Sequence, residues 1–174
     1  MAGPVPKSWS AAEVSTRNNM DMSATRESDL SGLSIRRLTV DDADAAAELS
    51  CQLGYPCSPD ELRERIADTS RSADRVAFAA VLDGQVVGWI DAAIERHLQS
   101  SACAVIGGLV VRDGARGLGI GRRLCLEVEE WARSKAIPVV RVRSQIKRED
   151  AHRFYLGGGY SKVKTSLVFE KRLS

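Results

Sequence analysis

The feature that most constrains the fold is a glycine-rich turn, Arg-Gly-Leu-Gly-Ile-Gly at residues 116–121. It joins an apolar segment that ends at Val111 to an amphipathic segment that ends near Ala136. Glycines expose backbone N–H groups, and the first N–H groups of a helix have no partner within the helix. Arg116, Arg122 and Arg123 lie at the positive end of that helix, where each cation is unfavourable by ~0.3–1 kcal/mol unless an anion is bound. The turn therefore predicts a phosphate site between a strand and a helix.

Two common phosphate motifs do not fit this turn. A P-loop ends in Gly-Lys-Ser/Thr, whereas this turn ends in Gly121-Arg122-Arg123. A dinucleotide-binding GxGxxG motif would need its third glycine at position 122 or 124, and those positions hold Arg122 and Leu124. The sequence thus excludes both motifs.

The rest of the chain predicts one mixed α/β domain over residues 33–174, preceded by a flexible arm at 1–32 that is poor in aliphatic residues. Asp83-Gly84 predicts a tight turn between antiparallel strands, and Gly107-Gly108 predicts a bulge within a strand. Leu124, Val128 and Trp131 share one face of the helix after the glycine turn. The expected strands are residues 33–38, 75–82, 85–97, 103–111, 139–142 and 163–169. The expected helices run from 41 or 42 to 53, from 58–61 onward, from 119 to 136 and from 149 to 157.

Charge and cysteine content narrow the class of protein. The net charge of +2 argues against a nucleic-acid partner, and no apolar run approaches the ~20 residues of a membrane helix. The four cysteines form no CxxC pair, which argues against a metal site and favours reduced thiols in the cytoplasm. No secretory signal is visible.

Two segments together resemble the GNAT acetyltransferase family. Arg116, Gly119 and Gly121 match that family's Arg/Gln-x-x-Gly-x-Gly/Ala signature, and residues 151–160 are similar to its Ala-x-x-Phe-Tyr-x-x-x-Gly-Phe/Tyr segment. The resemblance implies a central, mostly antiparallel sheet with a splayed parallel strand pair, flanked by helices. It also implies an N-acetyltransferase that uses acetyl-CoA as co-substrate and needs no metal.

The resemblance also implies where acetyl-CoA binds. The backbone near the end of the strand at 103–111 would meet the acetyl and pantetheine groups, and the glycine turn would hold the pyrophosphate. Gln145 stands where the family often has an asparagine that contacts pantetheine. The expected cofactor-binding residues are Leu109, Val110, Val111, Arg116, Gly117, Leu118, Gly119, Ile120, Gly121, Arg122 and Gln145.

Acetyl transfer to an amine needs a proton donor for the leaving thiolate and a base for the protonated amine. Tyr155 matches the family's tyrosine and is the expected general acid. The strand at 103–111 carries no acid, although many family members have a glutamate there. Asp91, Glu95 and His97 share one face of the preceding strand by its period of two. They are therefore candidates for the general base. The alternative is that they form a polar strand face that only contacts solvent.

The loop between the first two helices contains Tyr55, Cys57 and Asp60, and it usually lines the acceptor site in this family. These residues do not identify the amine, so small-molecule and peptide amines both remain as acceptors. The expected reaction is direct attack by a primary amine in a ternary complex. The alternatives are a catalytically degenerate acyl-CoA-binding sensor and a binding module whose turn holds another phosphate. Members of the family often form homodimers, but this sequence shows no interface pattern.

Overall fold

The computed structural model describes residues 30–173. The predicted flexible arm lies outside the described residues except for 30–32, where the Leu33 N–H donates to the Leu30 carbonyl at 3.0 Å. The chain divides into two compact units at the Arg141–Val142 boundary.

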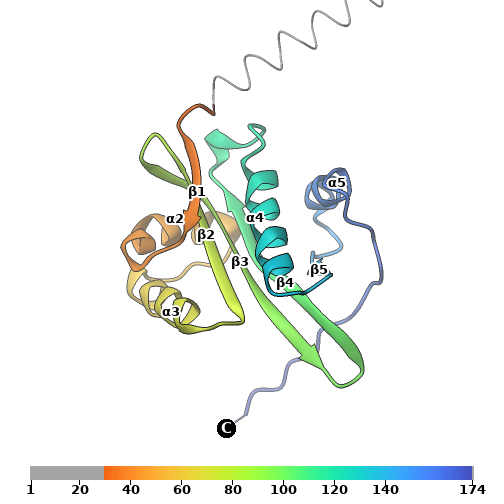
Figure 1. The fold of residues 1–174 in the computed structure, drawn as a ribbon. Helices are drawn as coiled ribbons and strands as arrows, with labels where there is room; N and C mark the ends of the chain where they lie inside the picture. The colour runs from red at the N-terminus through yellow and green to blue at the C-terminus, as the bar shows by residue number, and fades with distance from the viewer. Residues whose placement is uncertain (1–29, 174) are drawn as a thin grey trace, which may run out of the picture. The chain divides into compact units, whose positions relative to one another are not determined.

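The sheet has five strands in the order β1-β2-β3-β4-β5 (Figure 1). Strands β1 to β4 pair antiparallel with their neighbours, and β5 runs parallel to β4. This arrangement confirms the expected mixed, mostly antiparallel sheet. The strands are β1 (Leu33–Arg37), β2 (Arg75–Leu82), β3 (Gln85–His97), β4 (Ser100–Val111) and β5 (Val140–Val142).

The two turn predictions for this sheet are confirmed. Asp83 and Gly84 have φ values of 50° and 79° and connect the paired ends of β2 and β3, as a tight hairpin turn requires. In β4, Gly108 pairs with Asp91 while Ile106 pairs with Ala92. Gly107 is therefore an extra residue in β4, which is a β-bulge.

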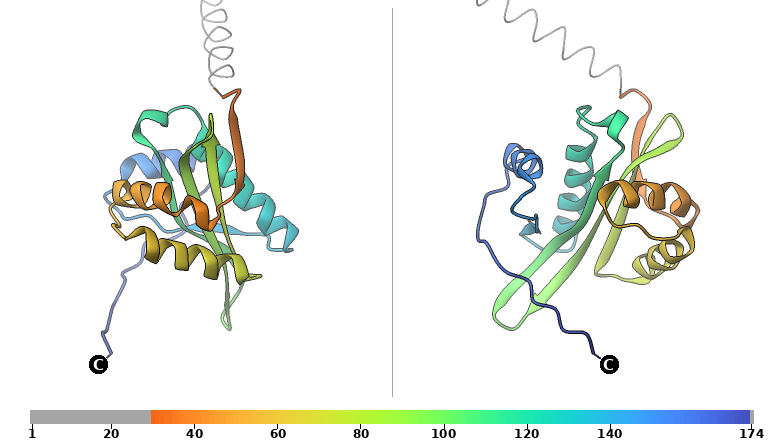
Figure 2. Two further views of the ribbon diagram at one scale, coloured as in Figure 1. Left: turned by 90° about the vertical axis from the view of Figure 1, so that its left-hand side faces the viewer. Right: turned by 180° about the vertical axis from the view of Figure 1, so that it is seen from behind.

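Helices cover both faces of this sheet. The helices α2 (Ala43–Leu53) and α3 (Pro59–Arg71) lie against one face, and α4 (Ile120–Ser134) lies against the other (Figures 1 and 2). Short 3₁₀ turns, η1 (Val40–Asp42) and η2 (Asp113–Ala115), precede α2 and α4. Gly54 ends α2 at a φ of 95°, and Ser58 caps α3 by accepting a hydrogen bond from the Glu61 N–H at 3.2 Å.

Apolar side chains fill the space between each helix layer and the sheet. On α4, Leu124 and Val128 are fully buried and Trp131 is 5% exposed, which confirms the predicted apolar face. The core between the sheet and α2 and α3 is a separate cluster. It comprises Leu38, Ala43, Ala46, Leu49, Ile66, Ala79, Val86 and Val110.

The second unit contains α5 (Glu149–Gly157), which ends before Gly158-Gly159 as expected. The prediction of a strand at 163–169 is wrong, because residues 160–173 form neither helix nor strand. Val163, Leu167 and Phe169 are 79–88% exposed. Alternating apolar residues favour a strand, but a strand also needs a neighbouring edge to pair its N–H and C=O groups. Among residues 30–173, no helix is both long and apolar enough to cross a membrane.

Candidate functional site

The predicted phosphate turn has the geometry of an anion cradle. Gly117 and Gly119 adopt φ values of 82° and 83°, a left-handed conformation that favours glycine. Both glycines are exposed, and Gly119 is the N-cap of α4. In the described chain, the N–H groups of residues 117–121 have no hydrogen-bond acceptor. The first turn of α4 contains no acid, so nothing in this turn repels an anion at the N-terminus of the helix.

Arg116 connects this cradle to the end of β4. Its Nε donates to the Val111 carbonyl at 3.2 Å, and its guanidinium lies 2.9 Å from the Asp113 carboxylate. The side chain is exposed, so an incoming phosphate can share these donors. Arg122 is also exposed, one turn into the helix.

Gln52 on α2 is a positioning residue that the sequence did not indicate. Its Nε2 donates to the Val111 carbonyl at 2.9 Å, and its Oε1 accepts from the Asp113 N–H at 3.2 Å. These two bonds hold the end of β4 and the start of the turn against α2. No sequence signal marks Gln52, because its partners lie about sixty residues further along the chain.

The three β4 residues expected near the acetyl group do not play equivalent roles. Val110 is 3% exposed and belongs to the core between the sheet and α2 and α3. Only its backbone can therefore face a ligand. Leu109 and Val111 are half-buried, and the Val111 carbonyl is already used by Gln52 and Arg116.

The three base candidates on β3 lie at different distances from the end of β4. Asp91 is opposite Gly108, three residues before Val111, or about 10 Å along the strand. Glu95 is opposite Cys103, eight residues before Val111, or about 26 Å. His97 pairs with Ser100 at the far hairpin, and its Nε2 lies 3.3 Å from the Glu95 carboxylate. The structure therefore separates Asp91 from the other two candidates.

The acceptor-loop candidates follow α2 and begin α3. Tyr55 is 62% exposed and Cys57 is half-buried. Asp60, in the first turn of α3, pairs with Arg63 on the same helix. Tyr55 is thus accessible and Cys57 partly so, while Asp60 forms a solvent-exposed ion pair within α3.

Tyr155 and Gln145 belong to the second unit. The Tyr155 ring on α5 packs edge-on against Phe154 and Tyr160, with centroids 5.0 and 5.5 Å away. The Gln145 carbonyl accepts from the Arg148 N–H at 3.0 Å and lies 3.1 Å from the His152 Nε2. These two edge-on contacts limit the orientations that the Tyr155 ring can adopt.

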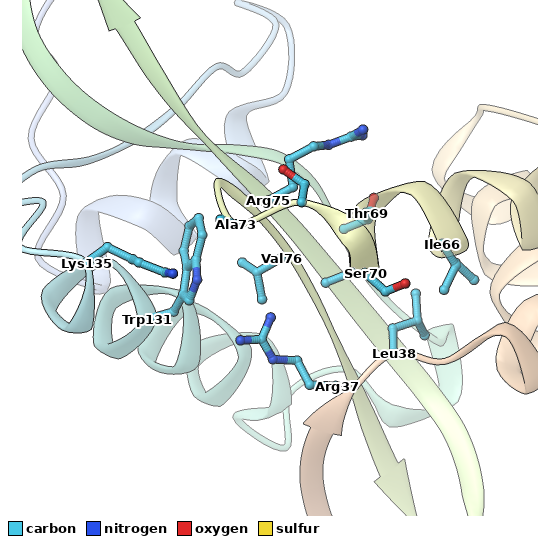
Figure 3. A pocket seen from close by; sticks show the side chains of 12 residues that line it. Arg37, Leu38, Ile66, Thr69, Ser70, Ala73, Arg75, Val76, Trp131 and Lys135 are labelled. Carbon is cyan, nitrogen blue, oxygen red and sulfur yellow. The ribbon is translucent and has the colours of Figure 1, made fainter.

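A cavity of about 260 Å³ lies at the start of β2, near the C-terminal ends of α3 and α4 (Figure 3). Arg37 and Lys135 extend towards Trp131 in it, and Arg75 lines it as well. None of the predicted site residues lines this cavity. In the part of the chain that the structure describes, no group of three or more His, Cys, Asp or Glu residues could hold a metal ion.

This chain is similar in sequence to known acetyltransferases. The model of the acetyltransferase (GNAT) family matches residues 43–158. Aminoalkylphosphonate N-acetyltransferase of Salmonella typhimurium is 33% identical over 133 residues, covering 72% of this chain and 83% of that protein. Aminoglycoside N(6')-acetyltransferase type 1 of Stenotrophomonas maltophilia is 27% identical over 144 residues, covering 80% and 93%.

A solved structure shows the same fold. Aminoglycoside 6'-N-acetyltransferase AAC(6')-Ih of Acinetobacter baumannii superposes with a TM-score of 0.73 at 22% identity, covering 82% of this chain and all of that one. The family match spans the sheet from β2 onward, the cradle and α5. The chain therefore belongs to the GNAT family and is an acetyl-CoA-dependent N-acetyltransferase.

Proposed function

We propose that this protein transfers the acetyl group of acetyl-CoA to a primary amine of a small molecule, by direct attack of the amine in a ternary complex. The observation that carries the proposal is the cradle at residues 116–122. Its exposed glycines, unpaired N–H groups and acid-free first helical turn suit a pyrophosphate.

The class of amine is inferred from the relatives. One is named for aminoalkylphosphonates and another for aminoglycosides, and both substrates are small polar molecules with a primary amine. We infer an acceptor of this kind, with aminoalkylphosphonates tested first because that relative is the more similar in sequence. Tyr55, Cys57 and Asp60 are the proposed acceptor-side residues, since they lie in and beside the exposed connection from α2 to α3.

Each part of the proposed site has a distinct role. The N–H groups of residues 117–121, with Arg116 and Arg122, hold the pyrophosphate. The backbone from Leu109 to Val111, together with Gln145, positions the pantetheine arm. Acetyl-CoA, when bound, supplies an acetyl group activated as a thioester. Tyr155 donates its phenolic proton to the departing thiolate, which a group with a pKa near ~10 can do for a thiol near ~8.5.

We also infer that the protein works in a reducing compartment such as the cytoplasm. The four cysteines, at positions 51, 57, 103 and 125, are all free, and free thiols persist where disulfides are kept reduced.

The test is release of CoA thiol by the purified protein with acetyl-CoA and a panel of amines. The panel contains aminoalkylphosphonates, aminoglycosides, a polyamine, an amino acid and a peptide with a free N-terminus. We expect turnover with at least one small amine and none without an amine. Stabilisation by acetyl-CoA with no thiol release on any amine would contradict the proposal. That result would favour the alternative function, an acyl-CoA-binding sensor without catalytic activity. The lack of any acid on β4 supports this alternative.

A further inference from the structure

The β4 bulge lies beside a carboxylate from the neighbouring strand. Asp91 on β3 is flanked by Ala77 of β2 and Gly108 of β4, and β3 is the central strand of the sheet (Figure 1). Gly107 is the extra residue of the bulge at this point. β4 itself carries no acid along its whole length.

The two glycines make room for the Asp91 carboxylate. A Cβ atom at Gly107 would lie 2.6 Å from Asp91 Oδ2 and 3.2 Å from Oδ1, and a Cβ at Gly108 would lie 3.0 Å from Oδ1. A Cβ at Gly108 would also lie 2.8 Å from the Trp89 ring. Neither glycine has a φ in the left-handed region. Glycine is therefore needed at these positions for packing and not for backbone conformation. The Asp91 carboxylate occupies the space that a Gly107 side chain would fill.

This carboxylate is partly buried yet borders an exposed piece of backbone. Asp91 is half-buried while Gly107 is exposed. Burial raises the pKa of Asp91, and it outweighs the Gly108 N–H hydrogen bond and the positive charge of Arg75, which both lower it. A carboxylate held in this way is a better proton acceptor than one in water.

Its position also suits the reaction better than that of the other acids on β3. Asp91 is about 10 Å along the strand from Val111, where the phosphate turn begins, whereas Glu95 is about 26 Å away. Glu95 also lies 3.3 Å from His97 at its end of the sheet, while Asp91 has no ion-pair partner within 4.0 Å among the described residues.

We propose that Asp91 is the carboxylate that binds the ammonium group of the acceptor and takes its proton, reaching the site from β3 through the gap left by Gly107 and Gly108 in β4. In this step an N–H bond of the ammonium breaks and its electron pair stays on nitrogen. The proton bonds to a carboxylate oxygen and then passes to water. The inference rests on the proposed function and names the residue that prepares the amine.

The first test is Asp91→Asn, which keeps the shape and the acceptor for the Gly108 N–H but removes the charge and the basicity. With an amine that the parent acetylates, kcat/KM for the amine should fall about 10²–10⁴-fold. The rise in melting temperature with acetyl-CoA should stay parental, which shows that the variant is folded and binds the donor. Parental kcat/KM in Asp91→Asn would overturn the role of Asp91. A larger loss in Glu95→Gln than in Asp91→Asn would also overturn it.

The second test moves the carboxylate to the other strand. Asp91→Ala combined with Gly107→Asp clears the space at the bulge and places an acid there from β4. We expect this double variant to recover part of the turnover that Asp91→Ala loses. The matched control, Asp91→Ala with Gly107→Ala, fills the bulge without an acid and should recover nothing. Equal activity in the two double variants would overturn the proposal.

These outcomes separate the inference from the function on which it rests. If the parent released no thiol with any amine, the proposed function and the role of Asp91 would both fail. If the parent acetylates an amine and Asp91→Asn does so equally well, only the role of Asp91 fails.

Discussion

Arg116 is a side chain that contacts the fold and that we propose also binds the pyrophosphate. Its guanidinium contacts the Val111 carbonyl and the Asp113 carboxylate, so the side chain is already directed to the start of the phosphate turn. These contacts reduce the rotamer freedom that Arg116 would lose on binding an anion.

Arg116→Ala should weaken acetyl-CoA binding roughly tenfold to a hundredfold, because a charge-assisted hydrogen bond to phosphate contributes on the order of 1.5–3 kcal/mol. Turnover at saturating acetyl-CoA should change less. Calorimetric titration with acetyl-CoA measures the affinity. The control is Arg133→Ala, at the opposite end of α4 in ion pairs with Glu129 and Glu130, which should bind like the parent. Equal affinity of Arg116→Ala and the parent would show that the cradle does not use this residue.

Tyr155→Phe removes one oxygen and keeps the ring contacts with Phe154 and Tyr160. Folding and acetyl-CoA affinity should barely change. Turnover should fall about 10²–10⁴-fold, the usual contribution of a positioned proton donor. The loss should be smaller with an acetyl thioester of a more acidic thiol, since that thiolate leaves without a proton. Steady-state kinetics with both donors provides the comparison, and equal losses would assign Tyr155 a role other than general acid.

Asp42 gives the protein a pH-dependent source of stability outside the site. Both its oxygens accept from Arg36, at 2.7 and 2.8 Å, and the Thr39 N–H donates at 2.8 Å. These hydrogen bonds hold the pKa of Asp42 below its usual value despite burial, and the bonds from Arg36 lower it most. Because the pKa of Asp42 is lower in the folded state, ionised Asp42 adds to the free energy of unfolding. This contribution is complete at pH values above the ordinary carboxylate pKa. It is lost as the pH falls through the lowered pKa of the folded protein.

Asp42→Asn should therefore lower the free energy of unfolding by about 1.5–3 kcal/mol at pH 7, with a smaller difference in acid. Denaturant unfolding at a series of pH values measures this difference. The control is the exposed neighbour Asp41, where Asp41→Asn should have a small effect at every pH. A difference for Asp42→Asn that did not shrink in acid would mean that its ionisation is not the source.

At the scale of elements, the turn between η2 and α4 connects the fold to the proposed donor site. Gln52 holds its start against α2, and Gly119 caps α4 in a left-handed conformation. The cradle is thus fixed at both ends by elements that belong to the core.

Gly119→Val should abolish binding of acetyl-CoA at concentrations that saturate the parent. A branched side chain is strained at a φ of 83°, and it would cover the N–H groups that we propose bind the pyrophosphate. The change in melting temperature on adding acetyl-CoA measures this effect. Gly114→Ala, in η2 with no atom within 4 Å of the added Cβ, is the matched control and should keep the parental shift. If both variants kept that shift, the pyrophosphate would bind elsewhere.

At the scale of the whole molecule, ligand binding and folding are linked. A ligand that binds only the folded state raises the free energy of unfolding, by about 2.7 kcal/mol at a concentration one hundred times its Kd. Acetyl-CoA should therefore raise the melting temperature, and CoA should do nearly as well because the pyrophosphate contacts are shared. ATP should do less, since it lacks the pantetheine arm. Differential scanning calorimetry at matched ligand concentrations measures this, and equal stabilisation by ATP and acetyl-CoA would contradict the assigned donor site.

The sequence by itself determined the features that depend on a few consecutive residues. Asp83-Gly84 specified a hairpin, Ser58 specified the start of α3, and Gly119 specified the N-terminus of α4, because each sets the local φ or satisfies local N–H groups. The Gly107-Gly108 pair likewise indicated a bulge. The backbone geometry of the glycine turn could be predicted for the same reason, since it depends on a contiguous segment, and phosphate binding there stays a prediction.

Only the tertiary structure decided the features that depend on partners distant in sequence. It brought Gln52 to the carbonyl of Val111, and it placed the Asp91 carboxylate in the space that a Gly107 side chain would fill. It left residues 163–169 without a strand, although their alternation favours one. The pairing of two strands, the packing of the Asp91 carboxylate and the hydrogen bonds of Gln52 each need atoms from two segments at once. Periodicity within one segment cannot specify where the other segment lies.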